Sequence, residues 1–454
     1  MRLRQAVFLT ILLITVPNTL AGDIYPGKEW LKYSNPAEAG FSTEKLDRLV
    51  EQYRENGGAA LIVIHDGAVL VTEGEIARSF RQHSIRKSYL SALFGIEVAR
   101  GSIDLEATLE ELGIDEREPL TETEKQAEVI DLLSARSGIY LPSAFSLRGM
   151  EENMPPRGSH APGNKWFYNN WDFNVAGKIF NNASSEDLFE AFSSRIATPL
   201  RFQDFDMSKT HYLYERKKSL HPAYLFRLSA RDMARFGLLY LNYGAWEGNQ
   251  LLPVDWVEKS TTPRSRKLFG EADDHYGYGL MWWTYNDLEG EKMYGAFGAG
   301  GQRISVFPES GLVLVHLTDT YINREISDDR INDLCRMLLQ ARIGKPAEDP
   351  ELEPLEVESM ELETVELSPE RLSVFEGSYR HRFLGVFRIT PGNGYLRMEA
   401  GIGSFRLLPQ AENLFISPDI RVPMEFRKGP ADQEGTFMTE MNDRREIERF
   451  VFYF

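Results

Sequence analysis

The 454-residue sequence contains one cysteine, Cys335, so no disulfide can form within the chain. It also lacks metal-binding patterns: the eight histidines are scattered singly, and no His-Glu-x-x-His motif or His/Cys cluster occurs. No glycine-rich phosphate loop of known spacing is present, so we expect neither a metal nor a nucleotide cofactor. Basic residues are also few, with 51 Lys and Arg against 68 Asp and Glu. The resulting net charge of −17 argues against a nucleic-acid partner and against binding to anionic membranes.

Long hydrophobic runs are absent except near the N-terminus. There, residues 6–16 are apolar, Arg2 and Arg4 precede them, and small residues ending at Ala21 form a cleavage site. This pattern predicts that residues 1–21 are a secretory signal peptide. The run is short for a membrane span and no cysteine stands directly after the cleavage site, so we expect no stable membrane or lipid anchor; an uncleaved anchor is the alternative. Export without disulfides is typical of a bacterial periplasmic or extracellular protein.

What the sequence does contain is enough apolar material for two or three domains, with 42% hydrophobic and 12% aromatic residues. A hairpin, a helical insertion, several antiparallel strands and a closing helix together predict an α+β arrangement. The polar segment 140–166 is typical of a loop that lines a cleft. The predicted helices are residues 42–53, 129–135, 229–240 and 327–341, and the predicted strands are 59–64, 69–71, 276–285, 292–297, 303–307 and 312–318.

The C-terminal part has a different composition. Nine of the twenty residues 347–366 are acidic and none is basic, which predicts a linker over residues 346–366. We therefore expect one domain over residues 22–345 and a second over residues 367–454. Seven short strands separated by turn residues predict that the second domain is a small all-β barrel or sandwich. These strands are residues 385–389, 395–399, 405–408, 414–417, 424–427, 436–439 and 449–453.

The segment 83–101 carries the first chemical motif. Apolar residues at three- and four-residue spacing predict a buried helix that ends at Gly101. Ser84 and Lys87 are three residues apart, so they share one face at the start of this helix. A buried amine can lose its proton and act as a base toward the hydroxyl, which makes Ser84 a candidate nucleophile. Alternatively, Ser84 only caps the helix.

Residues 84–103 resemble the nucleophile helix of the serine β-lactamase and penicillin-binding-protein superfamily. The resemblance implies an antiparallel sheet flanked by helices, a helical subdomain and two further motifs. Tyr168 and Asn170 match the second motif, Tyr-x-Asn. By resemblance, Tyr168 shuttles the proton of the nucleophile, while Asn170 holds Lys87 and a substrate amide. The alternative is an aromatic segment packed in the core.

The third motif of this superfamily is Lys or His, any residue, then Gly, and here it is altered. Ala296 stands at the basic position, whereas Gly298 is kept. The following Gly300-Gly301-Gln302, with Gln302 as a supporting residue, resembles a branch that includes esterases and 6-aminohexanoate-dimer hydrolases. The resemblance implies an oxyanion hole formed by the backbone N–H groups of Ser84 and Ala299.

The loss of the basic residue at Ala296 bears on the substrate, because a cation there would bind the carboxylate of a β-lactam or of a D-alanyl terminus. Arg303 is a candidate to replace that charge, although arginines on strands are common. His83 is expected to be structural. Four tryptophans are expected either to line an apolar cleft or to pack in the core: Trp166, Trp171, Trp282 and Trp283.

These observations favour an exported serine hydrolase that cleaves an ester or amide of a small-molecule or peptide-like substrate through a Ser84 acyl-enzyme. One alternative is a penicillin-recognising D-alanyl peptidase or β-lactamase. Another is a catalytically silent binding or sensor protein. The outline of the C-terminal β-domain is similar to the lipocalin-like domains of some serine hydrolases of this superfamily. It is expected either to form a homo-oligomer or to cover the cleft.

Overall fold

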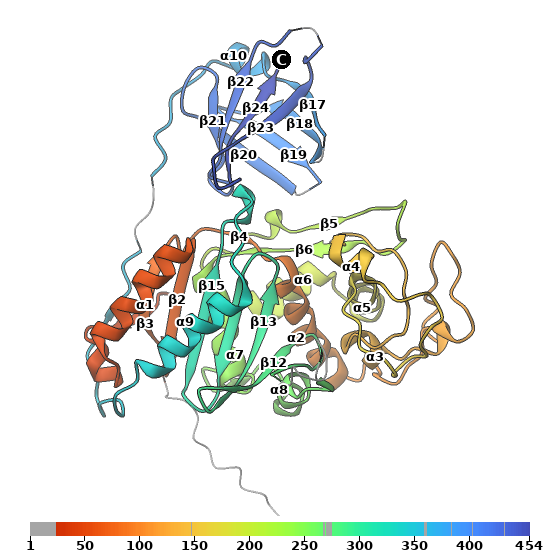
Figure 1. The fold of residues 1–454 in the computed structure, drawn as a ribbon, viewed down its shortest axis with the longest axis vertical. Coiled ribbons are helices and arrows are strands. Elements are labelled where there is room, and N and C mark those ends of the chain that lie inside the picture. The colour runs from red at the N-terminus through yellow and green to blue at the C-terminus, as the bar shows by residue number, and fades with distance from the viewer. Residues whose placement is uncertain are drawn as a thin grey trace, which may run out of the picture.

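The computed structural model describes residues 24–454 except 147, 267, 269–274, 358–360, 383, 402 and 431. The predicted signal peptide, residues 1–21, lies outside the described residues. Within the described part of the chain, no helix has both the length and the apolar character needed to cross a membrane. Figure 1 shows two bodies: a large one built on a sheet with helices around it, and a smaller β-barrel above it.

The large body is organised around a sheet to which the described residues contribute ten strands. Strand β15 pairs antiparallel with β2, from Leu312 opposite His65 to Leu317 opposite Ala60, so the two ends of the large body meet in the centre of the sheet. The described strand pairs of this sheet are antiparallel except that of β1 with β3, so the predicted antiparallel sheet is confirmed apart from one pair near its edge. In spatial order the strands are β10 (Ser265–Arg266), β11 (Tyr276–Tyr278), β12 (Trp283–Leu288), β13 (Glu291–Gly298), β14 (Gln302–Phe307), β15 (Leu312–Leu317), β2 (Ala60–His65), β3 (Ala68–Gly74), β1 (Leu31–Tyr33) and β16 (Leu352–Pro354).

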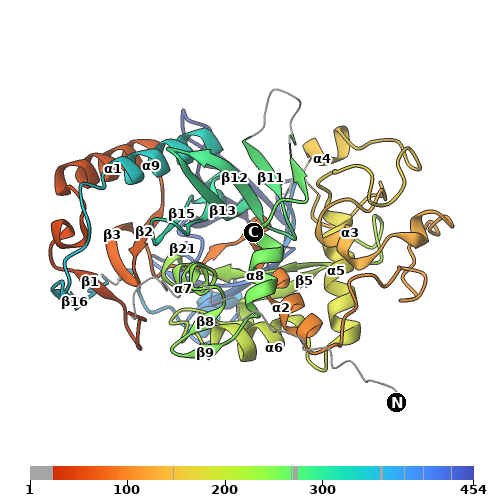
Figure 2. The ribbon, with the colours of Figure 1, turned by 90° about the horizontal axis from the view of Figure 1, so that it is seen from below.

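Both faces of this sheet are covered. In β2, Leu61 and Val63 belong to one hydrophobic cluster, whereas Ile62 and Ile64 belong to another. Successive side chains of a strand point to opposite faces, so a strand buried on both sides is apolar throughout. Figure 2 shows α1 and α9 side by side on one face and α7 on the other. The bounds of these helices are α1 (Thr43–Asn56), α7 (Ala230–Leu241) and α9 (Asp328–Gln340).

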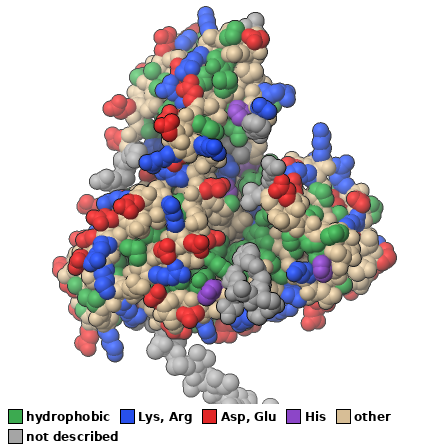
Figure 3. Space-filling model, in the orientation of Figure 1, with side chains coloured by type: hydrophobic (Ala, Val, Ile, Leu, Met, Phe, Trp, Pro, Cys, Tyr) green, Lys and Arg blue, Asp and Glu red, His purple; other side chains and the backbone are tan. Residues whose placement is uncertain are grey.

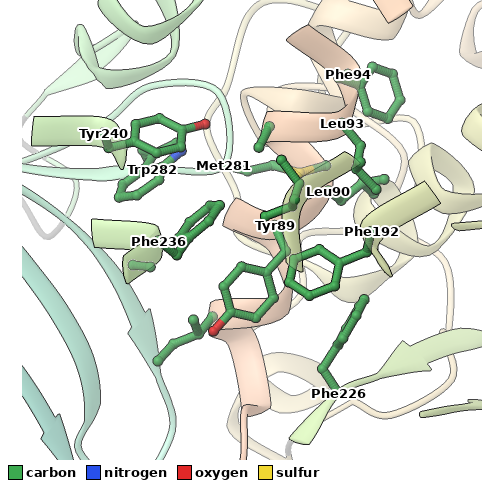
Figure 4. Packing of buried hydrophobic residues seen from close by; sticks show 14 of the residues in the cluster. Tyr89, Leu90, Leu93, Phe94, Phe192, Phe226, Phe236, Tyr240, Met281 and Trp282 are labelled. Atoms are coloured by element: carbon green, nitrogen blue, oxygen red, sulfur yellow. The ribbon is translucent and has the colours of Figure 1, made fainter. Parts of the chain in front are cut away.

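Helix α2 (Arg86–Ala99) is buried on nearly all sides. Its Ser88 and Ser91 hydroxyls donate to the carbonyl oxygens of Met281 and Leu280, each at 2.8 Å. Tyr89 packs edge-on against Phe236 of α7, with ring centroids 4.9 Å apart (Figure 4). These contacts hold the start of α2, which carries Lys87 and directly follows the turn with Ser84, against the sheet body.

A helical subdomain lies beside the sheet, as predicted. Helix α5 begins at Asn170, the last residue of the Tyr-x-Asn motif, and the Asn169 side chain caps it by accepting a hydrogen bond from the backbone N–H of Asp172. The remaining helices of the large body are α3 (Val129–Leu133), α4 (Arg148–Glu152), α5 (Asn170–Ala183), α6 (Leu188–Phe192), α8 (Val254–Thr261), the π-helical turn η4 (Ser193–Ala197) and the 3-10 turns η1 (Pro36–Ala39), η2 (His83–Ile85), η3 (Glu124–Gln126), η5 (Met207–Lys209) and η6 (Thr320–Ile322). The described residues also form three two-stranded antiparallel sheets, which pair β4 (Phe80–Arg81) with β7 (Arg227–Leu228), β5 (His211–Leu213) with β6 (Ala223–Leu225), and β8 (Ala245–Trp246) with β9 (Asn249–Gln250).

The C-terminal residues form a closed barrel, which decides between the predicted barrel and sandwich. The described residues contribute eight strands to it, one more than the sequence pattern predicts, because β17 was missed. Strands β22 and β24 are parallel, so the order differs from a simple up-and-down barrel. The elements are α10 (Pro369–Ser373), β17 (Gly377–His381), β18 (Gly385–Pro391), β19 (Leu396–Ala400), β20 (Gly403–Pro409), β21 (Leu414–Ile416), β22 (Pro423–Arg427), β23 (Thr436–Met441) and β24 (Ile447–Tyr453).

Two other segments differ from the sequence expectation. Residues 276–285 were predicted as one strand but form the hairpin β11–β12, which turns between Gly279 and Trp282. The turn was hidden because Trp282 is buried in the core like a strand residue. Within the acidic segment 346–366, β16 pairs with β1 and extends the sheet.

Candidate active site

Ser84 lies in the 3-10 turn η2, immediately before α2. Its side chain lines a cleft, while the next residue, Ile85, is fully buried in the main hydrophobic cluster. The turn therefore anchors one residue and presents its neighbour to a ligand. The predicted helix is present, with Ser84 in the turn that leads into it.

Lys87 lies one turn further along and connects two of the predicted site residues. Its Nζ atom is 3.0 Å from Ser84 Oγ and 2.6 Å from Tyr168 Oη. The same atom lies 4.1 Å from the ring centroid of Tyr168 and 4.5 Å from that of Phe173. Only 1% of Lys87 is exposed. The structure thus brings Ser84, Lys87 and Tyr168 together although Tyr168 is 81 residues from Lys87 in sequence.

Burial controls the protonation of this trio. It lowers the pKa of Lys87 well below 10.5, and the positive charge of Arg86 lowers the pKa further. Burial also raises the pKa of Tyr168 to about 12, although a hydrogen bond with Ser84 and the charge of Arg86 oppose that rise. These shifts favour a neutral phenol and a neutral amine, and a neutral amine within 3.0 Å of Ser84 Oγ has a lone pair available for the hydroxyl proton.

Arg86 was not among the sequence-predicted site residues. It is fully buried, its guanidinium lies 4.4 Å from the ring centroid of Tyr224, and one nitrogen is 3.5 Å from Asn174 Oδ1. This geometry keeps a positive charge beside Lys87 without placing an ammonium in the cleft. Its position next to Lys87 in the sequence was the signal that could have identified Arg86.

Asn170 is the first residue of α5. Its amide nitrogen donates to the carbonyl oxygen of Phe145, and its Oδ1 atom is buried without a hydrogen-bond partner in the described structure. Within the described residues, the Lys87 amine forms hydrogen bonds with Ser84 and Tyr168 and none with Asn170. Asn170 is buried and is not among the described residues that line the cleft, so the structure does not place it at the cleft surface.

The end of β13 lies against the turn that carries Ser84. A Cβ atom on Gly298 would be 3.0 Å from the Gln82 carbonyl oxygen and 3.3 Å from His83 Cβ. Any larger residue would push the strand away from the nucleophile. Gly298 and Ala299 both line the cleft beside Ser84. This close approach is what an oxyanion hole shared by Ser84 and Ala299 requires.

The altered third motif supplies no cation to the described part of the cleft lining. Ala296 is buried in the main cluster. Arg303 is completely buried: its guanidinium stacks 3.8 Å from the ring centroid of Phe297 and donates to Asn332 Oδ1 at 2.8 Å. The structure therefore does not bring Arg303 to the cleft surface. Gln302 is also buried, and its amide donates to the Thr318 carbonyl at 2.8 Å, so it supports the sheet behind the cleft.

The cleft has a volume of about 380 Å³, with aromatic side chains on one side and the segment Gly298–Gly301 and the carboxylates of Asp328 and Asp329 elsewhere in its lining. Trp283 and Phe297 stack with their ring centroids 5.6 Å apart and form one wall. Of the four tryptophans considered, Trp283 lines the cleft, while Trp171 and Trp282 are fully buried. Figure 3 shows hydrophobic side chains gathered in the hollow between the sheet and the helical part, below the barrel. Sequence analysis missed several lining residues, for which no motif existed: Met150, Tyr276, Ile326, Ser327, Asp328 and Asp329.

The described part of the chain offers no cluster of side chains that could hold a catalytic metal ion. No group of three or more His, Cys, Asp or Glu side chains there is arranged to hold a metal ion. The groups around Ser84 in the described part of the cleft are its hydroxyl, a buried amine, a phenol and backbone N–H groups, and Asp328 and Asp329 add carboxylates to the lining.

Comparison with known proteins places this geometry in context. Residues 46–334, more than half of the chain, match the family model described as Beta-lactamase. No curated protein matches the chain in sequence. Among solved structures, the fold is similar to that of a Bacillus anthracis protein assigned as a 6-aminohexanoate-dimer hydrolase, with a TM-score of 0.50, 20% identity and coverage of 64% of this chain and 80% of that one.

Two further structures share the fold. The octameric penicillin-binding-protein homologue from Pyrococcus abyssi has a TM-score of 0.51 and 19% identity, covering 82% of this chain and 92% of that one. A class C β-lactamase mutant has a TM-score of 0.51 and 14% identity, covering 68% of this chain and 99% of that one. The match to the Pyrococcus abyssi structure covers 82% of this chain, which is more than residues 1–345 contain, so the match extends into the C-terminal part.

Proposed function

This chain belongs to the β-lactamase family, and we propose that it is a serine hydrolase that cleaves an ester or amide bond through an acyl-enzyme on Ser84. One observation carries the proposal: the buried Lys87 amine lies 3.0 Å from Ser84 Oγ and 2.6 Å from Tyr168 Oη. A nucleophile in contact with a neutral base, which is itself in contact with a second proton carrier, is the arrangement that acyl transfer needs.

In the proposed first half-reaction, Ser84 Oγ attacks the substrate carbonyl carbon while Lys87 Nζ takes the hydroxyl proton. The carbonyl oxygen becomes an oxyanion, which the backbone N–H groups of Ser84 and Ala299 stabilise. Tyr168 then gives its proton to the leaving oxygen or nitrogen and recovers a proton from Lys87. The bond to the leaving group breaks, and an ester between the acyl group and Ser84 remains.

In the second half-reaction a water molecule attacks that ester. Its proton passes to Lys87 or Tyr168, which titrate as a coupled pair, and then to Ser84 Oγ as the acyl–oxygen bond breaks. The enzyme returns to its starting protonation state and releases a carboxylic acid.

The cleft favours a substrate recognised by its apolar part. Aromatic side chains form its wall, and Arg303 is stacked behind Phe297 and out of reach of a ligand. A D-alanyl peptidase or β-lactamase would bind the substrate carboxylate with a cation on this strand. Here Ala296 stands at the position of that cation. We therefore propose an esterase or amidase acting on a small-molecule or peptide-like compound.

Intact-protein mass spectrometry after exposure to a fluorophosphonate, and separately to a penicillin, tests the proposal. We expect one fluorophosphonate adduct on the wild-type protein, none on Ser84→Ala, and no penicillin adduct. The exposed-site variant Ser102→Ala is the matched control and should label like the wild type. A penicillin adduct on Ser84 would favour the cell-wall alternative. Absence of any adduct would favour a catalytically silent binding protein.

A further inference from the structure

Tyr321 belongs to the large body in sequence but to the barrel in its packing. It lies in η6, which follows β15 of the central sheet. Its side chain is only 7% exposed and is a member of the hydrophobic cluster that fills the barrel, with its ring centroid 6.3 Å from that of Phe405. Tyr321 therefore acts as a plug through which the barrel is seated on the large body.

Ion pairs and hydrogen bonds surround this plug. Arg78 pairs with Asp319 at 2.8 Å and also donates to the barrel carbonyls of Asp419 and Ile420, at 2.9 and 3.0 Å. Lys209 pairs with Asp419 at 2.8 Å. These contacts come from separate loops of the large body, and Figure 1 shows the barrel standing on this side of it. The barrel is thus docked at a defined position.

Two arginines also contact the ring of Tyr321 and that of its barrel neighbour Phe405. The guanidinium of Arg81 lies 5.0 Å from the Tyr321 ring centroid, and that of Arg227 lies 3.9 Å from the Phe405 ring centroid. Arg81 is three residues before Ser84, and Arg227 is on β7, which pairs with the strand containing Arg81. The segment that leads to the nucleophile therefore touches the plug directly.

The residue before Tyr321 connects the plug to the nucleophile turn. Thr320 Oγ1 lies 2.8 Å from His83 Nε2. The Thr320 methyl group also fills the space beside Gly300, where a Cβ atom would be 2.5 Å from it. One side chain thus contacts both halves of the candidate oxyanion site: the turn that carries Ser84 and the loop that follows Ala299.

His83 needs such support because its backbone is in an unfavourable conformation. Its φ angle is +42°, in the left-handed region that a non-glycine residue seldom adopts. Such conformations persist only where surrounding contacts hold them. Burial and the charges of Arg81 and Arg86 lower the pKa of His83 to about 3, so the ring is neutral and its bond to Thr320 does not depend on pH near neutrality.

We propose that Tyr321 is a positioning residue: its burial in the barrel holds η6 so that Thr320 orients His83, and with it Ser84, for acyl transfer. This inference rests on the proposed serine-hydrolase function. The described residues that line the cleft include none from the barrel, so the barrel supports catalysis through η6. Loss of the contact between Tyr321 and the barrel should lower the rate of acylation more than the affinity for substrate.

The pair Tyr321→Ala and Tyr321→Phe tests this in the full-length protein. The phenolic oxygen of Tyr321 is buried without a hydrogen-bond partner among the described residues, so Tyr321→Phe keeps every contact that matters. Misplacement of a reacting group by about 1 Å can reduce a rate about 100-fold. For hydrolysis of a p-nitrophenyl ester we expect Tyr321→Ala to lower kcat about 10- to 100-fold with KM changed less than about twofold. Tyr321→Phe should match the wild type.

A second pair tests the link without disturbing the barrel core. Thr320→Val keeps the methyl group beside Gly300 but loses the hydroxyl that contacts His83, whereas Thr320→Ser keeps the hydroxyl. We expect Thr320→Val to lower kcat about 10-fold and Thr320→Ser to retain most of the activity. This pair decides the question if Tyr321→Ala fails to fold.

Hydrogen–deuterium exchange of the peptide containing residues 82–90 gives a readout that does not require activity. Exchange should be faster in Tyr321→Ala and Thr320→Val than in the wild type, and unchanged in Tyr321→Phe. Folded variants with wild-type exchange in this peptide would overturn the positioning role, whatever their activity. A wild-type protein that neither reacts with a fluorophosphonate nor hydrolyses esters would instead overturn the proposed function.

Discussion

At the scale of a single residue, the burial of Lys87 serves catalysis but costs stability. Its amine is buried among Ser84, Tyr168 and Phe173, where it can act as a base. The same burial makes the protonated form unfavourable, and Arg86 adds a like charge. A site prepared for proton transfer in this way is expected to reduce the stability of the fold around it.

Lys87→Met should therefore abolish activity and stabilise the protein. Loss of the base should lower kcat by at least about 1000-fold, judged from the effect of general bases on reaction rates. The folded state should gain about 1 kcal/mol at pH 7 because methionine fills a similar volume without a buried amine. Urea unfolding and ester hydrolysis measure the two effects. Lys259→Met, at an exposed position on α8, is the matched control and should change neither.

The stabilisation should depend on pH in one direction. In the unfolded chain the lysine amine is protonated below about pH 10.5, whereas the lowered pKa keeps the amine of folded Lys87 neutral to a lower pH. The wild type therefore loses stability relative to Lys87→Met as the pH falls from about 10.5 to the pKa of the folded state. Below that pKa the difference is constant. A difference independent of pH over this range would contradict the lowered pKa of Lys87.

At the scale of elements, the position of α2 depends on how closely it packs against its neighbours. A Cβ atom on Gly95 would lie 2.3 Å from Trp256 Cδ1 of α8. Trp256 is itself buried, so the two helices cannot approach with a larger residue in between. The glycine fixes the separation of α2 and α8, and α2 in turn carries Lys87.

Gly95→Ala should accordingly destabilise the protein by about 1–3 kcal/mol, which is the usual range for overpacking a core. A shift of α2 should also move Lys87 relative to Tyr168 and lower kcat. Thermal unfolding and ester hydrolysis measure these effects. Gly149→Ala in α4 is the control, because a Cβ atom there meets nothing within 4 Å and should leave stability unchanged or slightly raised. Equal behaviour of the two variants would contradict the close packing at Gly95.

At the scale of the whole molecule, the segment between sheet and barrel belongs partly to the sheet. Strand β16 pairs with β1, and the backbone N–H of Leu355 donates to the Trp30 carbonyl at 2.9 Å. Leu355 and Val357 also pack against the main hydrophobic cluster. The acidic composition of residues 346–366 concealed these contacts, because the few apolar residues in it have no obvious period.

A comparison of two truncated chains tests the role of this segment. A chain of residues 22–357 keeps β16, whereas a chain of residues 22–345 loses it, and both lack the barrel. We expect the longer chain to be more stable by about 2 kcal/mol, from the apolar area of Leu355 and Val357 that it keeps buried. Urea unfolding of the two chains measures the difference. Identical stability of the two chains would mean that the pairing of β16 with β1 and the packing of Leu355 and Val357 do not stabilise the fold.

Sequence reasoning went furthest where local patterns carry the information. The helix with Ser84 and Lys87, the hairpin β2–β3 and most barrel strands follow from periodicity and turn residues. It failed where contacts between distant segments decide the structure. The turn before Trp282 was hidden by the burial of that residue, and the sequestration of Arg303 behind Phe297 depends on the approach of α9 to the sheet.

The sequence alone determined the family resemblance and the fold class and predicted Ser84, Lys87 and Tyr168 as candidate site residues, because these rest on short motifs in a given order. The tertiary structure alone decided that Lys87 lies between the other two and that the cleft wall is aromatic. It also decided that Tyr321 joins the barrel to the nucleophile turn through Thr320 and His83. The physical reason is that burial and distance depend on how remote segments pack, and spacing along one segment carries no record of that packing.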